Sequence, residues 1–121
     1  MPWRDLSSSQ LIDRIPLAVL VTRLDGRIEY ANPQANALLE ARSRRALHGH
    51  DVTEFRWGAD FRRVVSGSAP RAAGFAQWQD EARYRTSRGK EVWVLETMVP
   101  VPDAEGEVGC FIHFLQELPG G

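Results

Sequence analysis

The residues best suited to carry chemistry in this 121-residue chain are its histidines. His48 and His50 are separated by one residue and precede Asp51, so an extended loop would present two imidazoles and a carboxylate, the ligand types that zinc prefers. A third strong ligand is missing nearby. The simpler interpretation is a pair of solvated loop histidines, and we predict no metal site.

His113 occupies a different setting, an apolar stretch with β-branched and aromatic residues. Alternation along a strand would place His113 on the same face as Phe111 and Leu115. If that face is covered by helices, His113 is a polar group that could hydrogen-bond to a ligand. If it is not, His113 is an ordinary half-exposed histidine. The sequence leaves both interpretations open.

Aromatic and basic residues offer two further kinds of site. Trp57, Trp78 or Trp93 could stack on a noncovalently bound flavin, although Trp93 could equally be a core residue. An anionic head group could pair with one of four arginines, because a guanidinium meets a carboxylate with two hydrogen bonds. These are Arg62, Arg63, Arg83 and Arg85. Ordinary surface charge explains these arginines just as well.

Catalysis has little support in the sequence. No serine, histidine and acid occur in a recognisable triad context, and no glycine-rich phosphate loop is present. We therefore expect this chain not to be an enzyme.

The composition restricts the partners. The net charge is −1, which gives no electrostatic argument for binding nucleic acid or an anionic membrane. A single cysteine excludes an internal disulfide and fits a reducing compartment. The apolar run 16–21 is too short to span a bilayer, and the first residues contain no signal-peptide core. We expect one cytoplasmic domain.

The elements that would position these residues are organised around the stretch 18–39. Two apolar runs flank Asp25-Gly26, which predicts a hairpin with a primed turn. Asn32 followed by Pro33 predicts a helix start, because Asn caps the free N–H groups and proline suits the first helical position. Leu38 and Leu39 supply the apolar side of this helix.

The remaining elements follow from periodicity and from turn residues. A short helix is predicted at 10–14 with Ser9 as its cap, a helical piece at 44–47 after Ser43, and a turn from Asp51 or Thr53 to Phe55. The spacing of apolar residues predicts an amphipathic helix at 59–66. Further strands are predicted at 18–23, 27–31, 82–87 (75–79 being the weaker alternative), 91–101 and 107–116.

In this order the elements resemble a PAS domain. The segments that carry the resemblance are Ile15-Pro16 with AVLVT, DGRI and YANPQANALL, then LHGHD, RYRTSRGKEVWVLE and GEVGCFIHFLQEL. Each segment alone is weak and the ordered series is specific. The chain departs from the family at Glu40, where the first main helix often ends in glycine. It also departs at Gln116-Glu117-Leu118, where the chain leaves the domain after its last strand. This departure puts signal transmission through that segment in doubt.

The resemblance implies an α+β fold, a five-stranded antiparallel sheet in the order 2-1-5-4-3 with short helices across one face. It implies residues 1–8 as an N-terminal extension, 9–118 as one PAS domain and 119–121 as the start of a linker. The residues expected to line a ligand pocket serve equally well as plain core: Leu20, Ile28, Tyr30, Leu38, Leu39, Phe55, Phe61, Val65, Trp78, Trp93, Leu95, Phe111 and His113.

The function implied is that of a sensory module in a bacterial signalling protein, of the two-component or cyclic-dinucleotide type. It would bind a small ligand, or form a homodimer, and control an output domain outside this chain. The alternatives are a ligand-free module that dimerises or binds a protein, and a flavin or haem sensor. The residues expected at a dimer interface are Leu6, Leu11, Ile12 and Ile15.

The cofactor alternatives are weakened by the positions of the residues concerned. The cysteine signature of covalent flavin photosensors is absent, and haem-binding relatives carry their histidine near the helix before the third strand. The predicted helix 59–66 contains no histidine. We expect no cofactor, and the ligand, if one binds, stays unidentified.

Overall fold

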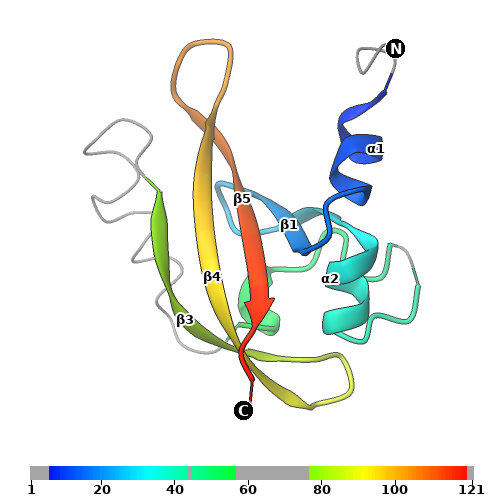
Figure 1. The fold of residues 1–121 in the computed structure, drawn as a ribbon. Helices are drawn as coiled ribbons and strands as arrows, with labels where there is room; N and C mark the ends of the chain where they lie inside the picture. Colours follow the sequence, from blue (N-terminus) through cyan, green and yellow to red (C-terminus); the bar gives the residue numbers. More distant parts are fainter. Residues whose placement is uncertain (1–5, 44, 57–76, 120–121) are drawn as a thin grey trace.

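The computed structural model describes residues 6–43, 45–56 and 77–119. Its strands form one antiparallel sheet in the order β2-β1-β5-β4-β3, which confirms the predicted fold (Figure 1). The elements in chain order are α1 (Ser8–Asp13), β1 (Ala18–Arg23), β2 (Ile28–Ala31), α2 (Pro33–Leu38), η2 (Val52–Glu54), β3 (Trp78–Arg85), β4 (Glu91–Pro102) and β5 (Val108–Glu117). No helix among the described residues is long and apolar enough to cross a membrane.

The β1–β2 hairpin forms where it was predicted, but its turn is of another type. The Arg23 and Arg27 backbones close the loop, with Arg23 N–H donating to Arg27 O at 2.9 Å, so three residues lie between them. Within this loop only Gly26 has a positive φ, of 91°. A primed turn needs positive φ at its first position, so that prediction was wrong. The geometry is that of a three-residue loop ending in a left-handed glycine.

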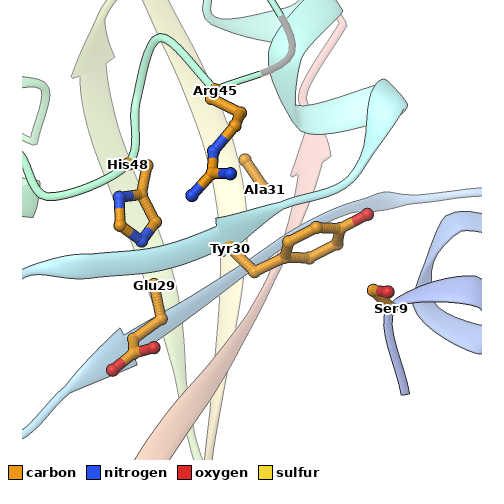
Figure 2. A pocket seen from close by; sticks show the side chains of 6 residues that line it. All are labelled: Ser9, Glu29, Tyr30, Ala31, Arg45 and His48. Atoms are coloured by element: carbon orange, nitrogen blue, oxygen red, sulfur yellow. The ribbon is translucent and has the colours of Figure 1, made fainter. Parts of the chain in front are cut away.

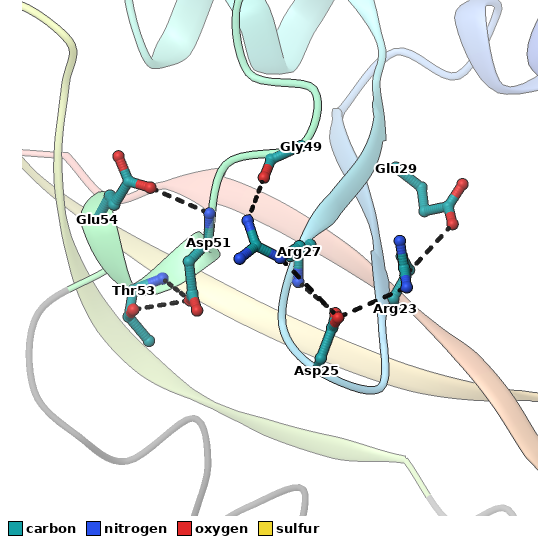
Figure 3. Close-up of polar contacts among 8 residues, drawn as sticks. All are labelled: Arg23, Asp25, Arg27, Glu29, Gly49, Asp51, Thr53 and Glu54. Carbon is teal, nitrogen blue, oxygen red and sulfur yellow. Dashed lines mark hydrogen bonds and ion pairs between the residues drawn. The ribbon is translucent and has the colours of Figure 1, made fainter.

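This hairpin is attached to η2, as Figure 3 shows. The Arg27 guanidinium donates to Gly49 O at 2.8 Å, and Val52 N–H donates to Gly26 O at 2.8 Å. Asp51 caps η2 and accepts from the backbone N–H of Thr53 at 3.0 Å. The predicted turn at this position is confirmed, with Asp51 as its cap.

Asn32 begins α2 as predicted, and it does more than cap. Its Oδ1 accepts from Ala35 N–H in α2 and from Val19 N–H in β1, both at 2.9 Å. Its Nδ2 donates to Leu17 O at 2.8 Å and to Ile12 O, in α1, at 3.2 Å. One fully buried amide therefore connects α1, β1 and α2.

Helix α1 is confirmed in place but begins earlier than predicted. Its cap is Ser7 instead of Ser9: the Ser7 side chain accepts from Gln10 N–H, and the Gln10 side chain accepts from Ser7 N–H. This reciprocal pair satisfies two donors that a lone Ser9 cap would leave free. At its other end, Asp13 accepts a hydrogen bond from the Tyr30 hydroxyl.

Alternation along the strands gives the sheet two distinct faces. The inner face carries the even-numbered residues of β1, β3 and β4 and the odd-numbered residues of β5, and α2 packs against it at β1 and β2. The hydrophobic core lies here and includes Leu20, Leu39, Leu47 and Phe111. The outer face carries the alternate residues of the same strands.

The β3–β4 hairpin is held to the end of α2. Glu40 follows α2 with a φ of 54°, a left-handed conformation that costs a residue with a side chain about 1 kcal/mol or more. Its carboxylate accepts from the Thr86 hydroxyl at 2.6 Å, and Ser87 N–H donates to Leu39 O at 2.8 Å. The glycine that the resemblance places here is therefore replaced by a residue in the glycine conformation.

The other predicted elements divide into three groups. The strands predicted at 91–101 and 107–116 are confirmed within one residue at each end, whereas β3 spans 78–85, between its two predicted positions. Residues 45–48 form turns instead of the predicted helical piece. The predicted helix at 59–66 lies outside the described residues.

Candidate functional site

A buried polar cluster lies on the inner face of the sheet, and it is the candidate functional site. Its centre is Glu96 in the middle of β4, whose side chain is 1% exposed. Around it are Arg56, just after η2, Tyr84 on β3 and His113 on β5. Thr22, on β1, extends the cluster. We call these five residues the Glu96 cluster.

Every member of the cluster is connected by short hydrogen bonds. Arg56 Nε donates to Glu96 Oε1 at 2.8 Å, and the Tyr84 hydroxyl donates to Glu96 Oε2 at 2.6 Å. His113 Nδ1 lies 3.0 Å from Glu96 Oε2, and its Nε2 lies 2.8 Å from Thr22 Oγ1. The chain of contacts runs across the sheet from β3 to β1.

Local structure explains how Arg56 reaches the cluster. Phe55 O accepts from Arg85 N–H, and Arg56 forms an isolated antiparallel bridge with Tyr84, so these two residues just after η2 lie beside the end of β3. The Arg56 guanidinium also lies over the Trp78 ring, 5.7 Å from its centroid. A cation over an aromatic face is held electrostatically, which fixes the side chain from a second direction.

The electrostatics keep Glu96 ionised. Burial by itself raises the pKa of a carboxyl, but hydrogen bonds and charge from His113, Arg56 and Tyr84 outweigh it and lower the pKa of Glu96 to about 2. For Tyr84 the effects add in the other direction: burial and the neighbouring Glu96 carboxylate raise the pKa of its hydroxyl well above the usual value. The cluster therefore buries an ion pair and a neutral phenol.

The ionised carboxylate also fixes the role of the His113 Nδ1 nitrogen. A carboxylate can only accept, so the proton between Glu96 and His113 resides on Nδ1. When the imidazole is neutral, Nε2 accepts from the Thr22 hydroxyl, and when the imidazole is charged, Nε2 donates to the Thr22 oxygen.

Most residues expected to line the pocket do lie around this face. Leu20, Ile28, Leu39, Phe111 and His113 are at most 1% exposed, and Leu20 pairs with His113 in the β1–β5 register. Leu38, Phe55 and Trp78 are partly buried against the same core. These residues lie in one layer of the domain. Phe61 and Val65 lie outside the described residues.

Three of the predicted pocket residues lie elsewhere. Trp93 and Leu95 alternate with Val92, Val94 and Glu96 on β4, so they lie on the outer face, and Trp93 is 39% exposed. Tyr30 pairs with Val21, also an outer-face residue, and its hydroxyl bonds to Asp13 in α1. The prediction of a core-facing position was wrong for these three. The alternation correctly placed Trp93 and Leu95 on one face of β4, but the prediction assigned that face to the core.

The outer face is largely apolar. Leu95, Ile112 and Phe114 on this face are partly exposed, and the Arg83 guanidinium lies over the Trp93 ring at 5.5 Å from its centroid. Among the residues expected at a dimer interface, Leu6 and Leu11 are 38% and 40% exposed, and Ile12 and Ile15 are half-buried.

The loop histidines do not form a metal centre within the described parts of the chain. There, no group of three or more His, Cys, Asp or Glu side chains could hold an ion. His50 Nδ1 lies 3.1 Å from Glu54 Oε1, and the Asp51 carboxylate is engaged at the start of η2.

Sequence reasoning missed Glu96, Arg56, Tyr84 and Thr22. One signal was available: Val92, Val94, Glu96 and Met98 share a face, so an acid interrupts an apolar stripe and must find partners there. The Arg56 partner, 40 residues away in sequence, had no local signal.

Comparisons with known proteins agree with this architecture. A family model described as PAS domain matches residues 16–118. Similar solved structures include a PAS domain of a protein from Colwellia psychrerythraea (TM-score 0.75, 22% identity, 88% of this chain and 89% of that chain). Among curated proteins, none matches the sequence.

Two further structures share the fold at lower identity. One is the PAS domain, in complex with ethanol, of a transcriptional regulator in the LuxR family from Burkholderia thailandensis (TM-score 0.71, 18% identity, 93% of this chain and 98% of that chain). The other is a LOV domain of a blue-light activated histidine kinase from Erythrobacter litoralis (TM-score 0.68, 15% identity, 87% and 98%).

Proposed function

This chain belongs to the PAS domain family, and on that premise we propose that it is a sensory module whose stimulus acts at the Glu96 cluster. In this proposal a small polar ligand binds at the inner face, in a cytoplasmic signalling protein, and the response is passed to an output domain outside this chain. The observation that carries the proposal is a buried ion pair, Arg56 with Glu96, in a layer that apolar side chains alone could fill.

The energetics favour a switching role over a purely structural one. Replacing a buried ion pair by well-packed apolar residues is often neutral or stabilising, so the pair is weak evidence for a stabilising role. Removing one partner, however, costs about 3–5 kcal/mol, because an uncompensated charge is left buried. A ligand that takes one hydrogen bond from Glu96 would therefore force its other partners to rearrange.

The ligand expected is small and carries a hydrogen-bonding group. A donor group competes with Arg56, Tyr84 or His113 for the Glu96 carboxylate, and a carboxylate competes with Glu96 for Arg56. The partly buried Trp78 and Phe55 would contact its apolar part. The ethanol complex of a structural neighbour is compatible with this size and polarity.

A path to the output follows from the strands that carry the cluster. Glu96 and His113 belong to β4 and β5, and Leu118, just beyond β5, donates its N–H to Trp93 O in β4 at 2.9 Å. A change in the Glu96–His113 contact alters the pairing of the two strands next to the chain exit. Binding would thus shift a conformational population without any covalent chemistry.

A second candidate function is dimerisation of the module, with or without a ligand. It is favoured by the outer face, where Trp93 is 39% exposed among apolar neighbours, and by exposed Leu11 on α1. In a homodimer these side chains would be buried against a second copy.

The flavin and haem alternatives have less support. One structural neighbour is blue-light activated, and light reception requires a chromophore such as flavin. In this chain Trp93 lies on the outer face, and both ring nitrogens of His113 are engaged within the Glu96 cluster, so neither is available to iron.

The test begins with protein purified from its own cells, by native mass spectrometry and absorption spectroscopy. An added mass that is lost in Glu96→Gln and retained in Glu81→Gln, an exposed control on the paired strand, supports a ligand at the Glu96 cluster. A flavin peak or Soret band favours the cofactor sensor. An unliganded dimer favours the dimerisation module, and an unliganded monomer contradicts both proposals.

A further inference from the structure

A cavity separate from the Glu96 cluster lies at the outer edge of β2. Its volume is about 430 Å³, and Figure 2 shows its lining. β2 is an edge strand, and on this side the backbone of Ile28 bonds to Gly49 and His50 in the loop before η2 instead of to a further strand. The lining residues come from α1, β2 and the loop before η2, and they are Ser9, Glu29, Tyr30, Ala31, Arg45 and His48.

One wall of this cavity is basic. Arg45 and His48 lie three residues apart in the loop, and both side chains extend toward β2 (Figure 2). Both are exposed, and neither side chain has a hydrogen-bond or ion-pair partner within the described part of the chain. The Glu29 carboxylate, also in the lining, lies 3.9 Å from Arg23 Nε, so an arginine already compensates its charge.

The floor of the cavity is apolar and fixed. The Tyr30 ring is held because its hydroxyl bonds to Asp13 in α1, and Ala31 is 7% exposed. A flat ring beside two nitrogen-rich side chains suits a ligand with an apolar body and one anionic group. Ser9 adds a hydroxyl on the α1 side.

From this arrangement we infer that the β2-edge cavity binds a small organic carboxylate whose apolar body, aromatic or compact aliphatic, rests on Tyr30. The Arg45 guanidinium donates to the carboxylate, because its planar fork matches the two oxygens. His48 supplies a further donor. A metal cation is not the expected ligand, because a guanidinium in the lining repels it.

The site would have a structural consequence that the Glu96 cluster does not have. Its ligand would contact α1 and the loop at 45–48 at once, and the two segments lie on opposite sides of β2 (Figure 2). Occupancy would therefore add a link between the N-terminal helix and the segment that leads to η2. This inference does not depend on the proposed function of the inner face.

The test uses benzoate as the probe, with benzylamine, inorganic phosphate and benzyl alcohol as comparisons. Each is titrated into ¹⁵N-labelled protein while amide chemical shifts are followed. We expect benzoate to produce saturable shifts at Tyr30, Ala31, Arg45 and His48. Its affinity should exceed those of benzylamine and benzyl alcohol by about tenfold, as a charge-assisted hydrogen bond implies.

Variants locate the anion-binding group. Arg45→Gln should weaken benzoate binding about tenfold, whereas Arg88→Gln, an exposed arginine on the β3–β4 turn, should leave it unchanged. The dispersion of the spectra shows whether each variant is folded. Equal binding of benzoate and benzylamine, or equal effects of the two variants, would overturn the inference. Phosphate binding as tightly as benzoate would overturn the role of the apolar floor.

One further outcome separates the two sites. If benzoate shifts only the amides around Glu96 and His113, the β2-edge site is wrong and a ligand site at the inner face gains support. If it shifts only the β2-edge amides, the inference stands whether or not the Glu96 cluster binds a ligand.

Discussion

On β4, even-numbered residues face the inside of the domain and odd-numbered residues face outward, so this strand allows two environments to be compared. Inside, Glu96 is 1% exposed and carries a charge. Outside, the neighbouring Trp93 is 39% exposed and carries a large apolar surface. At these two positions the ordinary pattern of a half-buried sheet, with apolar residues inside and polar residues outside, is reversed, whereas Val94 and Met98 on the inner face of β4 follow it.

This difference separates folding from association. Partner groups within the same chain compensate the buried charge, so the inner face needs no further partner to be stable. Removing one of these groups would lower the free energy of unfolding. The exposed apolar residues have no comparable compensation within the described residues, and large apolar patches on a surface mark sites of interaction. We therefore expect substitutions on the inner face to affect folding and substitutions on the outer face to affect association.

The largest effect is expected for Glu96→Gln. The substitution removes the carboxylate charge that lies 2.8 Å from the buried Arg56 guanidinium, and it should lower the free energy of unfolding by about 3–5 kcal/mol. Urea denaturation at neutral pH measures it. The matched control Glu81→Gln, on the exposed surface of β3, should change stability by less than about 0.5 kcal/mol. Equal effects of the two variants would contradict the distinction between the faces.

The next largest effect is a pH dependence of the free energy of unfolding, which arises from Glu96 on the inner face. The pKa of Glu96 falls from an ordinary 4.5 to about 2 on folding, so its ionised form favours the folded state. This contribution, about 3 kcal/mol, is complete above pH 4.5 and is lost as the pH falls toward 2. The stability difference between the wild type and Glu96→Gln should therefore shrink across this range. A constant difference down to pH 3 would contradict the lowered pKa.

On the outer face, Trp93→Ala should act on association. An aromatic residue at the centre of an interface contributes about 2 kcal/mol, so the dimer dissociation constant should rise about 30-fold. Sedimentation equilibrium measures this, while urea unfolding of the monomer should change by less than about 1 kcal/mol. Leu24→Ala, which removes another exposed apolar residue in the β1–β2 loop, should leave the dimer unchanged. A dimer insensitive to Trp93→Ala does not use this face.

The smallest effect is expected for the Arg83–Trp93 contact. The two residues are opposite each other on β3 and β4, and an exposed cation over an aromatic ring contributes about 0.5–1 kcal/mol. A double-mutant cycle with Arg83→Gln and Trp93→Leu measures the coupling. A coupling free energy as large as the effect of Glu96→Gln would contradict the distinction between the buried inner face and the exposed outer face.

Much of the fold could be predicted because its signals are local. Asn32-Pro33 starts a helix, Asp25-Gly26 turns a hairpin, and the alternation of apolar residues identifies β4 and β5. Even here the turn type was wrong, because loop length depends on where the flanking strands pair, and that pairing is not encoded by the two turn residues alone. The cap of α1 moved to Ser7 for a similar reason, since Gln10 completes its capping box.

The candidate site could be predicted only in part. His113 was identified because a histidine within an apolar strand is conspicuous, but its partners Glu96 and Thr22 lie on two other strands of the sheet. Periodicity shows that Trp93 and Glu96 have opposite orientations without showing which is inside. That choice is made by α2 and by Arg56, through contacts between residues distant in sequence.

The amide of Asn32 has a consequence for how the domain opens. Its side chain bonds to the Val19 and Ala35 amides and to the carbonyls of Leu17 and Ile12 at the same time. The start of β1, the end of α1 and the first turn of α2 therefore cannot be released one by one. In native-state hydrogen exchange, the Val19 and Ala35 amides should exchange with one common opening free energy, as a single cooperative unit.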